Sequence, residues 1–406
     1  MRKKQIMTTV ALMLLTAAIT YCITLYASER EYNAKLANLS EREAEYAKIA
    51  EVRGYIDKYF VEDYEEKDIT DGALYGMVAM LGDRWSYYLP AEEFSAVVNS
   101  TSGKIVGIGI NASYDSDAGE LIVLDVFEDS PAEDAKLQPF DRIVNVDGAD
   151  VSQIGYDAAV KKIQGVAGTV VSISVKREGA PNLITLSITR REIDVQSVKS
   201  KILDGNIGYI KISSFDANVD KDFATALANL KKADVKGIVF DVRNNPGGLL
   251  NVLVKTLDPL LPEGIIISEE NKEGKSMTHF SDKNELNLPM AVITNEYSIS
   301  AAEFFAAAIQ ESGKGKVVGT PTTGKGLAQS QIPLKDGSGL ILSVSKYYTG
   351  RGTSLVDTGG IKPDKVVELT EDQTKRFYLL KDHEDPQLQA AIEIVKGQKE
   401  TTEEQG

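Results

Sequence analysis

The sequence is short of cysteine, of histidine and of positive charge. Its one cysteine, Cys22, excludes disulfides and thiolate zinc sites, and its position near the N-terminus excludes a cysteine nucleophile. Two histidines, His279 and His383, are too few for the usual histidine metal sites. The net charge of −15, from 45 basic and 60 acidic residues, argues against a nucleic-acid partner. We therefore expect no metal ion, no cofactor and no nucleic acid at the functional site.

An uncharged run near the N-terminus is the first feature that the chain does contain. Arg2, Lys3 and Lys4 precede an apolar segment over residues 6–27, which as a helix measures about 33 Å against roughly 30 Å of hydrocarbon. The basic residues favour a cytoplasmic N-terminus, which places the remaining chain outside the cytoplasm. A cleaved signal peptide is the alternative, but the segment is long for one. We predict a single-pass anchor in the cell membrane over residues 1–28.

The composition and the predicted secondary structure of the remaining chain change several times along its length. The part that follows the anchor is charged with helical spacing, and could be a stalk, a dimerising helix or a helix packed on the body. Within it, GDRWSYYLPAEEF reads as a turn followed by a helix start around Pro90. The remaining predicted parts are a helical region (29–103), a β-rich domain (104–193), an α/β core (194–369), terminal helices (370–397) and a disordered tail (398–406).

Short β-rich runs within residues 104–193 predict a small domain of five strands and two helices. The predicted strands are 105–110, 121–127, 141–146, 169–177 and 183–189. With Val106-Gly107-Ile108-Gly109 at its start and DRIVNVDG further on, this segment resembles a PDZ domain. The resemblance implies that Val106, Gly107, Ile108 and Gly109 bind the terminal carboxylate of a peptide, which adds as a strand beside the second helix. Phe140 departs from the family, which usually has glycine there.

Residues 290–331 read as a buried strand, a polar turn, a helix, a second strand and a loop in which Lys325 stands between two glycines. A hydroxyl at the helix start and a lysine nearby are the layout of an activated nucleophile and its base. Ser300 is the candidate nucleophile and Ser298 the alternative. Ser300 and Glu303 also match a capping box, so the serine could serve only as a helix cap.

Lys325 can act as a base only when it is neutral. Its pKa must then fall from about 10.4 toward roughly 7–8, at about 1.4 kcal/mol per unit. Burial lowers the pKa of a lysine, and Gln329 can accept a hydrogen bond from the amine to orient it. The alternatives are a solvated loop lysine and an exposed strand glutamine.

Glycines follow another predicted strand, over residues 237–242. Gly247 and Gly248 lie between this strand and a predicted helix over 249–260, so their N–H groups can converge on an oxyanion, although a tight turn is the simpler interpretation. Asp241, Arg243 and Glu303 read as structural supports. Further strand–helix units are expected from strands at 264–268, 290–294 and 316–319, followed by a hairpin over 327–347. Ligand groups in such a layout gather at the carboxyl ends of strands.

Several motifs in this order resemble the carboxy-terminal processing proteases, a family of extracytoplasmic serine peptidases. They are GYIKISSF (208–215), DVRNNPGGLL (241–250), SISAAEFFAAAIQE (298–311), VVGTPTTGKGLAQ (317–329) and GIKPD (360–364). The resemblance implies a multidomain α/β protein with a crotonase/ClpP-like core and an inserted PDZ domain. It implies a dyad of Ser300 and Lys325 supported by Gln329. The oxyanion hole would use the amides of Ala301 and of Gly247 or Gly248.

The expected protein is thus a membrane-anchored extracytoplasmic serine endopeptidase that cleaves proteins near their exposed C-termini. Two other classes stay open at this point. The chain could be an inactive PDZ scaffold, or a crotonase-like acyl transfer enzyme, because helix-start oxyanion holes serve that chemistry as well. A base formed by His279 is a further alternative, but this residue lies in a polar stretch away from the predicted strand ends. Ile299 and Ala302 interrupt the small residues and serines that the family usually has around its nucleophile.

Overall fold

A computed structural model describes residues 46–403 of the chain, which divide into two compact units between Ala73 and Leu74. In the first unit, residues 46–59 are helical and are followed by the start of α2 (Glu66–Ala79). The predicted membrane anchor over residues 1–28 lies outside the described residues. Within residues 46–403, no helix combines the length and the apolar character needed to cross a membrane.

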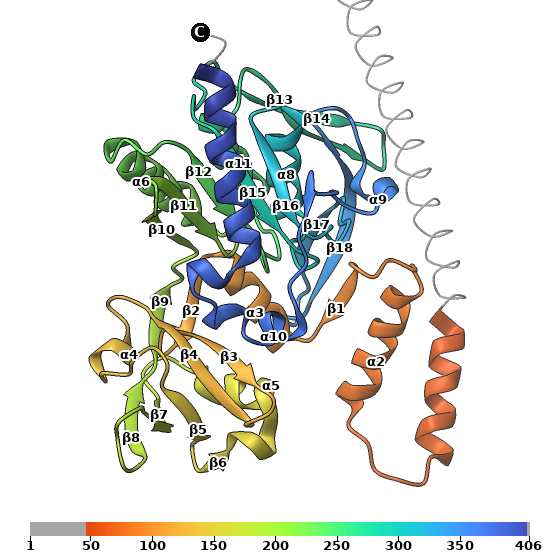
Figure 1. The fold of residues 1–406 in the computed structure, drawn as a ribbon. Coiled ribbons are helices and arrows are strands. Elements are labelled where there is room, and N and C mark those ends of the chain that lie inside the picture. The colour runs from red at the N-terminus through yellow and green to blue at the C-terminus, as the bar shows by residue number, and fades with distance from the viewer. Residues whose placement is uncertain (1–45, 404–406) are drawn as a thin grey trace, which may run out of the picture. The chain divides into compact units, whose positions relative to one another are not determined.

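The β-rich domain of the second unit is an antiparallel sheet closed by two helices (Figure 1). Its strand order is β3 (Ile110–Asp115), β4 (Glu120–Val126), β5 (Arg142–Val146), β7 (Val170–Lys176) and β8 (Ile184–Thr189), with β6 (Ala149–Asp150) beside β5. The helices are α4 (Pro131–Asp134) and α5 (Val151–Ile163). Alternate residues of the strands fill a separate core, as period-two patterning requires.

Four of the five strands predicted for this domain are confirmed, and the first is wrong. Residues 105–110 do not form one strand but end β2 (Lys104–Gly107) and begin β3, because the chain turns between them at Gly109, whose φ is +82°. β2 pairs instead with β9 (Arg191–Asp194) in a two-stranded antiparallel ribbon. This ribbon carries the chain from the core into the β-rich domain and back (Figure 1).

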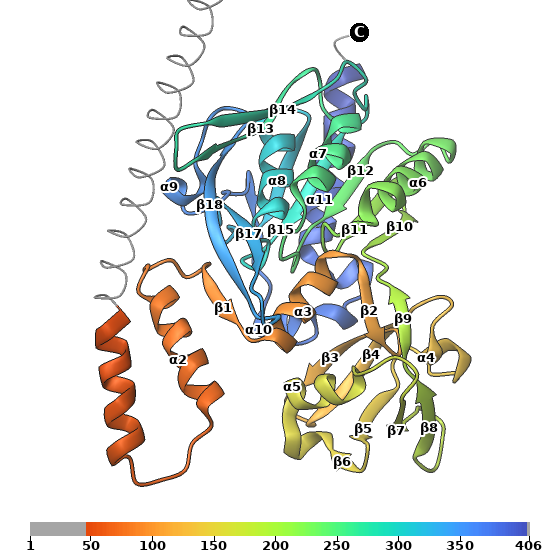
Figure 2. The ribbon, with the colours of Figure 1, turned by 180° about the vertical axis from the view of Figure 1, so that it is seen from behind.

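The core contains a mostly parallel six-stranded sheet covered on both faces. Its strands follow the order β10 (Val198–Leu203), β11 (Ile207–Ile212), β12 (Ile238–Asp241), β15 (Met290–Thr294), β16 (Gly315–Gly319) and β19 (Lys365–Val366). The helices α6 (Val219–Lys232), α7 (Leu250–Leu257) and α8 (Ala301–Glu311) cover one face (Figure 2), and α11 (Pro386–Glu403) covers the other (Figure 1). Burial on both faces explains why β12 and β15 are continuous apolar runs.

A second, antiparallel sheet of the core combines distant parts of the chain. It has the order β1 (Tyr87–Leu89), β18 (Gly339–Thr349), β13 (Gly264–Asn271) and β14 (Ser276–Ser281), with β17 (Leu327–Pro333) also paired to β18. The expected hairpin of β17 and β18 is confirmed. The expected parallel role of 264–268 is wrong, because β13 pairs antiparallel with β14 and β18. The segment read as a turn supplies β1 before α3 (Ala91–Thr101), so the N-terminal region contributes a strand to the second sheet of the core.

The C-terminal segment differs from its predicted form at two points. The first expected terminal helix is broken into α10 (Glu371–Lys375) and the turns η2 (Phe377–Leu379) and η3 (Asp382–Glu384). The second, α11, runs to Glu403, so the expected disordered tail over 398–406 is helical up to that residue. The remaining short elements are η1 (Asp258–Leu260) after α7 and α9 (Leu355–Thr358) after β18.

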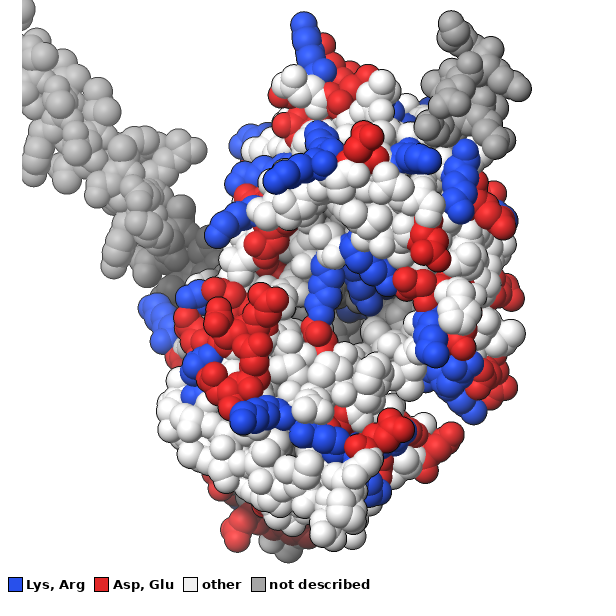
Figure 3. Space-filling view, turned by 60° about the vertical axis from the view of Figure 1, so that its left-hand side comes forward, with Lys and Arg blue, Asp and Glu red and all other residues white. Residues whose placement is uncertain are grey.

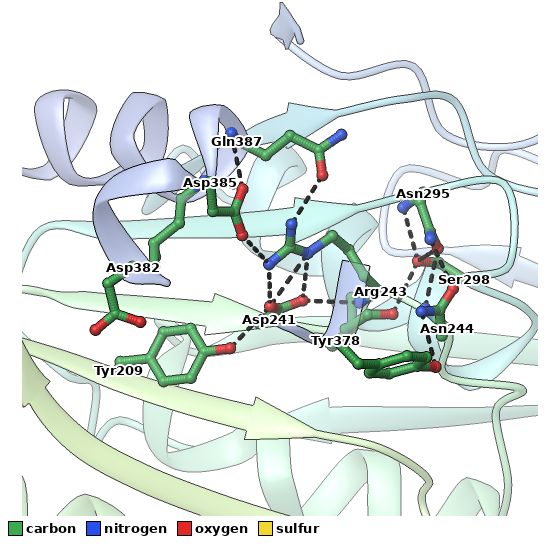
Figure 4. Close-up of polar contacts among 12 residues, drawn as sticks. Tyr209, Asp241, Arg243, Asn244, Asn295, Ser298, Tyr378, Asp382, Asp385 and Gln387 are labelled. Carbon is green, nitrogen blue, oxygen red and sulfur yellow. Dashed lines mark hydrogen bonds and ion pairs between the residues drawn. The ribbon is translucent and has the colours of Figure 1, made fainter. Parts of the chain in front are cut away.

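A buried ionic network fastens the start of α11 to the end of β12 (Figure 4). The Arg243 guanidinium, 4% exposed, donates to Asp241 (2.6 Å) and to Asp385 (2.8 Å), and also to the Gln387 side chain (2.9 Å). Tyr209 donates its hydroxyl to Asp241 (2.8 Å). Because every member has partners, burying these charges is tolerated. This arrangement agrees with the interpretation of Asp241 and Arg243 as structural supports.

Candidate active site

Ser300 begins α8 in a strained backbone conformation. Its φ of +56° and ψ of −115° lie in a region that residues other than glycine seldom adopt. The turn that holds it is anchored by Ser298, which is fully buried and donates its hydroxyl to the Val242 carbonyl (2.8 Å). The Ile299 N–H donates to the Asn245 carbonyl (2.9 Å). Ser298 therefore has a structural task, whereas Ser300 is presented beyond the carboxyl end of β15.

The loop after β12 packs directly against this serine. A Cβ atom built on Gly247 would lie 2.9 Å from the Ser300 Cβ, too close for two carbon atoms, and the φ of Gly247 is +99°. Only glycine fits there. The Asn245 side chain accepts the Gly247 N–H (2.8 Å) and donates to the Ile212 carbonyl (2.8 Å), which ties the loop to β11.

These bonds determine which of the predicted oxyanion donors remain available. The Gly247 N–H is used by Asn245. By contrast, the N–H groups of Gly248 and Ala301 donate to no group within residues 46–403. Ala301 is the first residue of α8, where a helix leaves its N–H groups unpaired and carries partial positive charge. Among the predicted oxyanion donors, the N–H groups of Gly248 and Ala301 are therefore the ones left available.

Lys325 lies half-buried in the loop before β17. Its ammonium donates to Gln329 Oε1 (2.5 Å) and lies over the Trp85 ring, 4.7 Å from the centroid. Gln329 donates its amide N–H to the Trp85 carbonyl oxygen. That bond turns the amide so that its oxygen faces the lysine. The β-bulge between Ala328 and Gln329 directs this side chain, so the bulge adds to the simple strand alternation expected from the sequence.

Burial lowers the pKa of Lys325 below the ordinary lysine value of 10.5. The carboxylates of Asp83 and Glu303 act in the opposite direction. Among the described residues, the hydrogen bond of this ammonium goes to Gln329 and not to Ser300. The lysine is thus a partly desolvated amine whose approach to the serine remains to be made, as is common in unliganded active sites.

Glu303 connects the two halves of the site. It is fully buried and accepts the backbone N–H groups of both Ser300 (2.8 Å) and Lys325 (2.8 Å) through Oε2. Its Oε1 accepts the Thr322 hydroxyl (2.6 Å) and the Gly324 N–H (2.7 Å). One carboxylate therefore fixes the start of α8 and the lysine loop relative to each other. The capping box expected of Ser300 and Glu303 is present, so this serine caps α8 in addition to any role of its hydroxyl.

The predicted peptide-binding residues line a groove in the β-rich domain. A cavity of about 290 Å³ is bounded by Gly107, Ile108 and Gly109 of the β2–β3 turn, by β3 and by α5. Val106 lies in β2, just before this turn. Gly109 leaves no room for a side chain, because an added Cβ would clash with Ser130. The groove thus has the place and shape that strand addition requires, while its occupant stays a prediction.

Sequence reasoning missed Trp85, Asn245 and the central position of Glu303. Trp85 precedes β1, and only the pairing of β1 with β18 brings it to the lysine. Asn245 stood within a quoted motif, but its two side-chain bonds reach backbone groups that the motif does not identify. His279 lies in β14, at the opposite end of the second sheet from β1. Within residues 46–403, no group of His, Cys, Asp and Glu side chains could hold a metal ion.

Comparisons with known proteins agree with this geometry. Residues 206–367 match the model of peptidase family S41, residues 97–176 match the PDZ domain, and residues 13–93 match the N-terminal domain of the activating protease CtpB. The carboxy-terminal processing protease CtpA of Bacillus subtilis is 32% identical over 370 residues, covering 91% of this chain and 78% of that protein. CtpB of the same species is 34% identical over 80% of this chain and 68% of that protein.

A solved structure shows the same fold. An S41 protease from Bacteroides fragilis superposes with a TM-score of 0.59 at 20% identity, and the match covers 84% of this chain and 92% of that one.

We predict that Glu303→Gln destabilises the protein and reduces its peptidase activity. An amide has one acceptor oxygen, so two of the four donors around residue 303 would lose their partner, at a cost of roughly 2–6 kcal/mol in the free energy of unfolding. Thermal unfolding and the turnover of a peptide substrate measure the two effects. Glu296→Gln, which alters an exposed carboxylate bonded to Thr320, is the matched control and should change neither. Equal stability of the two variants would contradict the proposed role of Glu303.

Proposed function

Because the chain belongs to peptidase family S41, as a carboxy-terminal processing serine protease with a PDZ domain, we propose that Ser300 is its nucleophile and Lys325 its general base. The observation that carries this assignment is the bond of one buried carboxylate, Glu303, to the backbone N–H groups of both residues. A strained serine at a helix start and a lysine with a lowered pKa support it. Gln329 orients the lysine.

The first half of the reaction forms an acyl-enzyme. The Ser300 oxygen attacks the carbonyl carbon of the scissile peptide bond, and its proton passes to the neutral amine of Lys325. The negative charge that develops on the carbonyl oxygen is received by the N–H groups of Gly248 and Ala301, and each donor contributes a factor of about 10²–10³ in rate. The C–N bond then breaks, and the leaving amine takes the proton from the Lys325 ammonium.

The second half returns the enzyme to its starting state. A water molecule attacks the ester carbon and transfers a proton to the again neutral Lys325. The same two N–H groups receive the second oxyanion. When the ester C–O bond breaks, Ser300 recovers its proton from the lysine. No step needs a group other than those of the chain, its substrate and water.

Two features upstream of the core complete the proposal: an anchor in the cell membrane and a homodimer. The basic residues and apolar run of residues 1–28 support the anchor, with the catalytic part outside the cytoplasm. Exposed apolar side chains in the first unit, among them Ile49 (48%) and Val52 (53%), support a self-association surface.

One experiment tests both features. The full chain should sediment with membranes and resist alkaline extraction, whereas a chain that begins at residue 29 should be soluble and have the light-scattering mass of two chains. Release of the full chain by alkali would contradict the anchor, and a single-chain mass would contradict the dimer.

We expect Ser300→Ala and Lys325→Ala each to reduce the cleavage of an unfolded protein by roughly 10⁴-fold or more. Ser300→Ala should also abolish labelling by a fluorophosphonate. The control is Ser298→Ala, which loses the bond to the Val242 carbonyl and should lower the melting temperature while labelling persists. Labelling that persists in Ser300→Ala and disappears in Ser298→Ala would reverse the assignment.

The pH dependence of kcat/KM should report the base. Activity requires neutral Lys325, so kcat/KM should rise with pH through its pKa, below the range of an ordinary lysine. Gln329→Glu places a carboxylate beside the ammonium, favours the charged form and should move this rise to higher pH by about 1–3 units. Gln331→Glu makes the same change of charge at an exposed position of β17 and is the control. An equal shift in both variants would contradict a contact role for Gln329.

A further inference from the structure

A second cavity, larger than the peptide groove, opens between the PDZ domain and the protease core. It has a volume of about 590 Å³ and is bounded on the PDZ side by β3, β4 and Tyr156 of α5. On the core side it is bounded by Lys199 of β10, Lys211 of β11, Arg243 and Tyr378. Figure 3 shows Lys and Arg side chains at the rim of a hollow in a surface that otherwise mixes both charges. The chain as a whole has a net charge of −15, so this concentration of cations is a local feature.

The larger cavity continues the peptide groove. Asn111, Ala112 and Tyr156 line both cavities. Within the described residues β3 pairs only with β4, so its other edge, beside α5, can accept a strand. A peptide whose carboxylate sits at the Gly107–Gly109 turn and which runs antiparallel to β3 passes Asn111 first and Tyr114 last. At about 3.3 Å per residue, roughly the third to fifth residues before its C-terminal one arrive at the larger cavity.

Two lysines of this cavity face each other at close range. Lys199 and Lys211 are direct partners in the antiparallel pairing of β10 and β11, so both side chains project from the same face of the sheet. Like charges in this position destabilise a sheet. Burial lowers the pKa of both lysines, which shows that their charged forms are poorly solvated where they stand. An anion between them would relieve both penalties.

The other charged groups of the cavity leave Lys211 as the available cation. Arg243 is occupied by Asp241, Asp385 and Gln387. Lys199 forms an ion pair with Asp125 of β4. Lys211 lies over the rings of Phe377 (5.9 Å) and Tyr378 (5.3 Å). Among the described residues it forms no ion pair, although the more distant carboxylates of Asp241 and Asp385 partly offset the lowering of its pKa by burial.

We propose that this cavity is a subsite for an acidic side chain of the substrate tail, placed about three to five residues before the C-terminal carboxylate. The Lys211 ammonium is the main group that binds this acidic side chain. The Lys199 ammonium also binds it when the ion pair of Lys199 with Asp125 opens. The preferred substrates are therefore proteins whose tails combine a terminal carboxylate with an upstream Asp or Glu. This inference rests on the proposed function, because it extends the groove in which the tail is captured.

Binding to the full chain carrying Ser300→Ala, which cannot consume the peptide, tests the subsite. The probes are short fluorescent peptides with one apolar C-terminal sequence that carry Asp or Asn at the fourth position before the end. Fluorescence anisotropy should give the Asp peptide about tenfold tighter binding at low salt. The advantage should decline as salt is raised. Moving the Asp to the penultimate position should remove the advantage. Equal affinity of the Asp and Asn peptides, or no binding of either, would overturn the proposal.

Substitutions in the cavity should change the preference for the Asp peptide in opposite directions. Lys211→Gln combined with Lys199→Gln should abolish the preference for the Asp peptide. Asp125→Asn should strengthen this preference, because Lys199 then loses its ion pair with Asp125 and can bind the peptide. Lys201→Gln, an exposed lysine of β10 paired with Asp382 outside the cavity, is the matched control and should retain the preference. A preference that falls equally in Lys201→Gln would show a general effect of charge and overturn the subsite. The increase expected for Asp125→Asn cannot result from misfolding, because a misfolded variant would lose the preference for the Asp peptide.

Two further outcomes separate the subsite from the proposed function. If wild-type protein cleaves substrates with both tails at equal kcat/KM and Ser300→Ala cleaves neither, the proposed protease mechanism stands and the subsite fails. If Ser300→Ala still cleaves, the proposed nucleophile fails while the binding comparison still decides on the subsite. Amidation of the peptide C-terminus should remove binding of both peptides. An Asp preference that survives amidation would overturn the placement upstream of a seated carboxylate.

Discussion

The arrangement of this protease depends on a single buried carboxylate. Glu303 is surrounded by four donors from two short stretches of chain: Ser300 at the helix start, and Thr322, Gly324 and Lys325 in one loop. A buried, desolvated carboxylate is tolerated only while its hydrogen-bond partners are present. The strained backbone of Ser300 is held by the same carboxylate, so strain at the proposed nucleophile and placement of the proposed base have one common origin.

A second layer of contacts conditions the base. The Trp85 ring covers the Lys325 ammonium, and the Trp85 carbonyl turns Gln329 so that its oxygen accepts from that ammonium. Both come from the segment before β1, which joins the core through the pairing of β1 with β18 and through the bond of the Ser343 N–H to the Ser86 hydroxyl. The proposed catalytic apparatus therefore includes contacts from residues that precede the PDZ domain in the chain. The protease domain is complete only when sequence from both sides of the insertion folds together.

Sequence reasoning reached the parts of the site that local pattern controls. Buried parallel strands read as apolar runs, and side chains at their carboxyl ends meet at one sheet edge, which pointed to Ser300 and Lys325. It did not reach Trp85, whose partner Gln329 is 244 positions away. Nor did it place the strand that begins at Gly264, because an apolar run does not say whether its neighbours are parallel or antiparallel. Contacts of this kind are set by topology, not by local composition.

The β2–β9 ribbon has an evolutionary consequence. Because the two strands lie side by side, the PDZ domain leaves and rejoins the core through one narrow neck. A module joined in this way can be exchanged, enlarged or lost without cutting the sheets that carry Ser300 and Lys325. Recognition of a substrate tail and hydrolysis of a peptide bond can thus diverge independently within one lineage. The β2–β9 ribbon is where a domain of different specificity can replace the existing one.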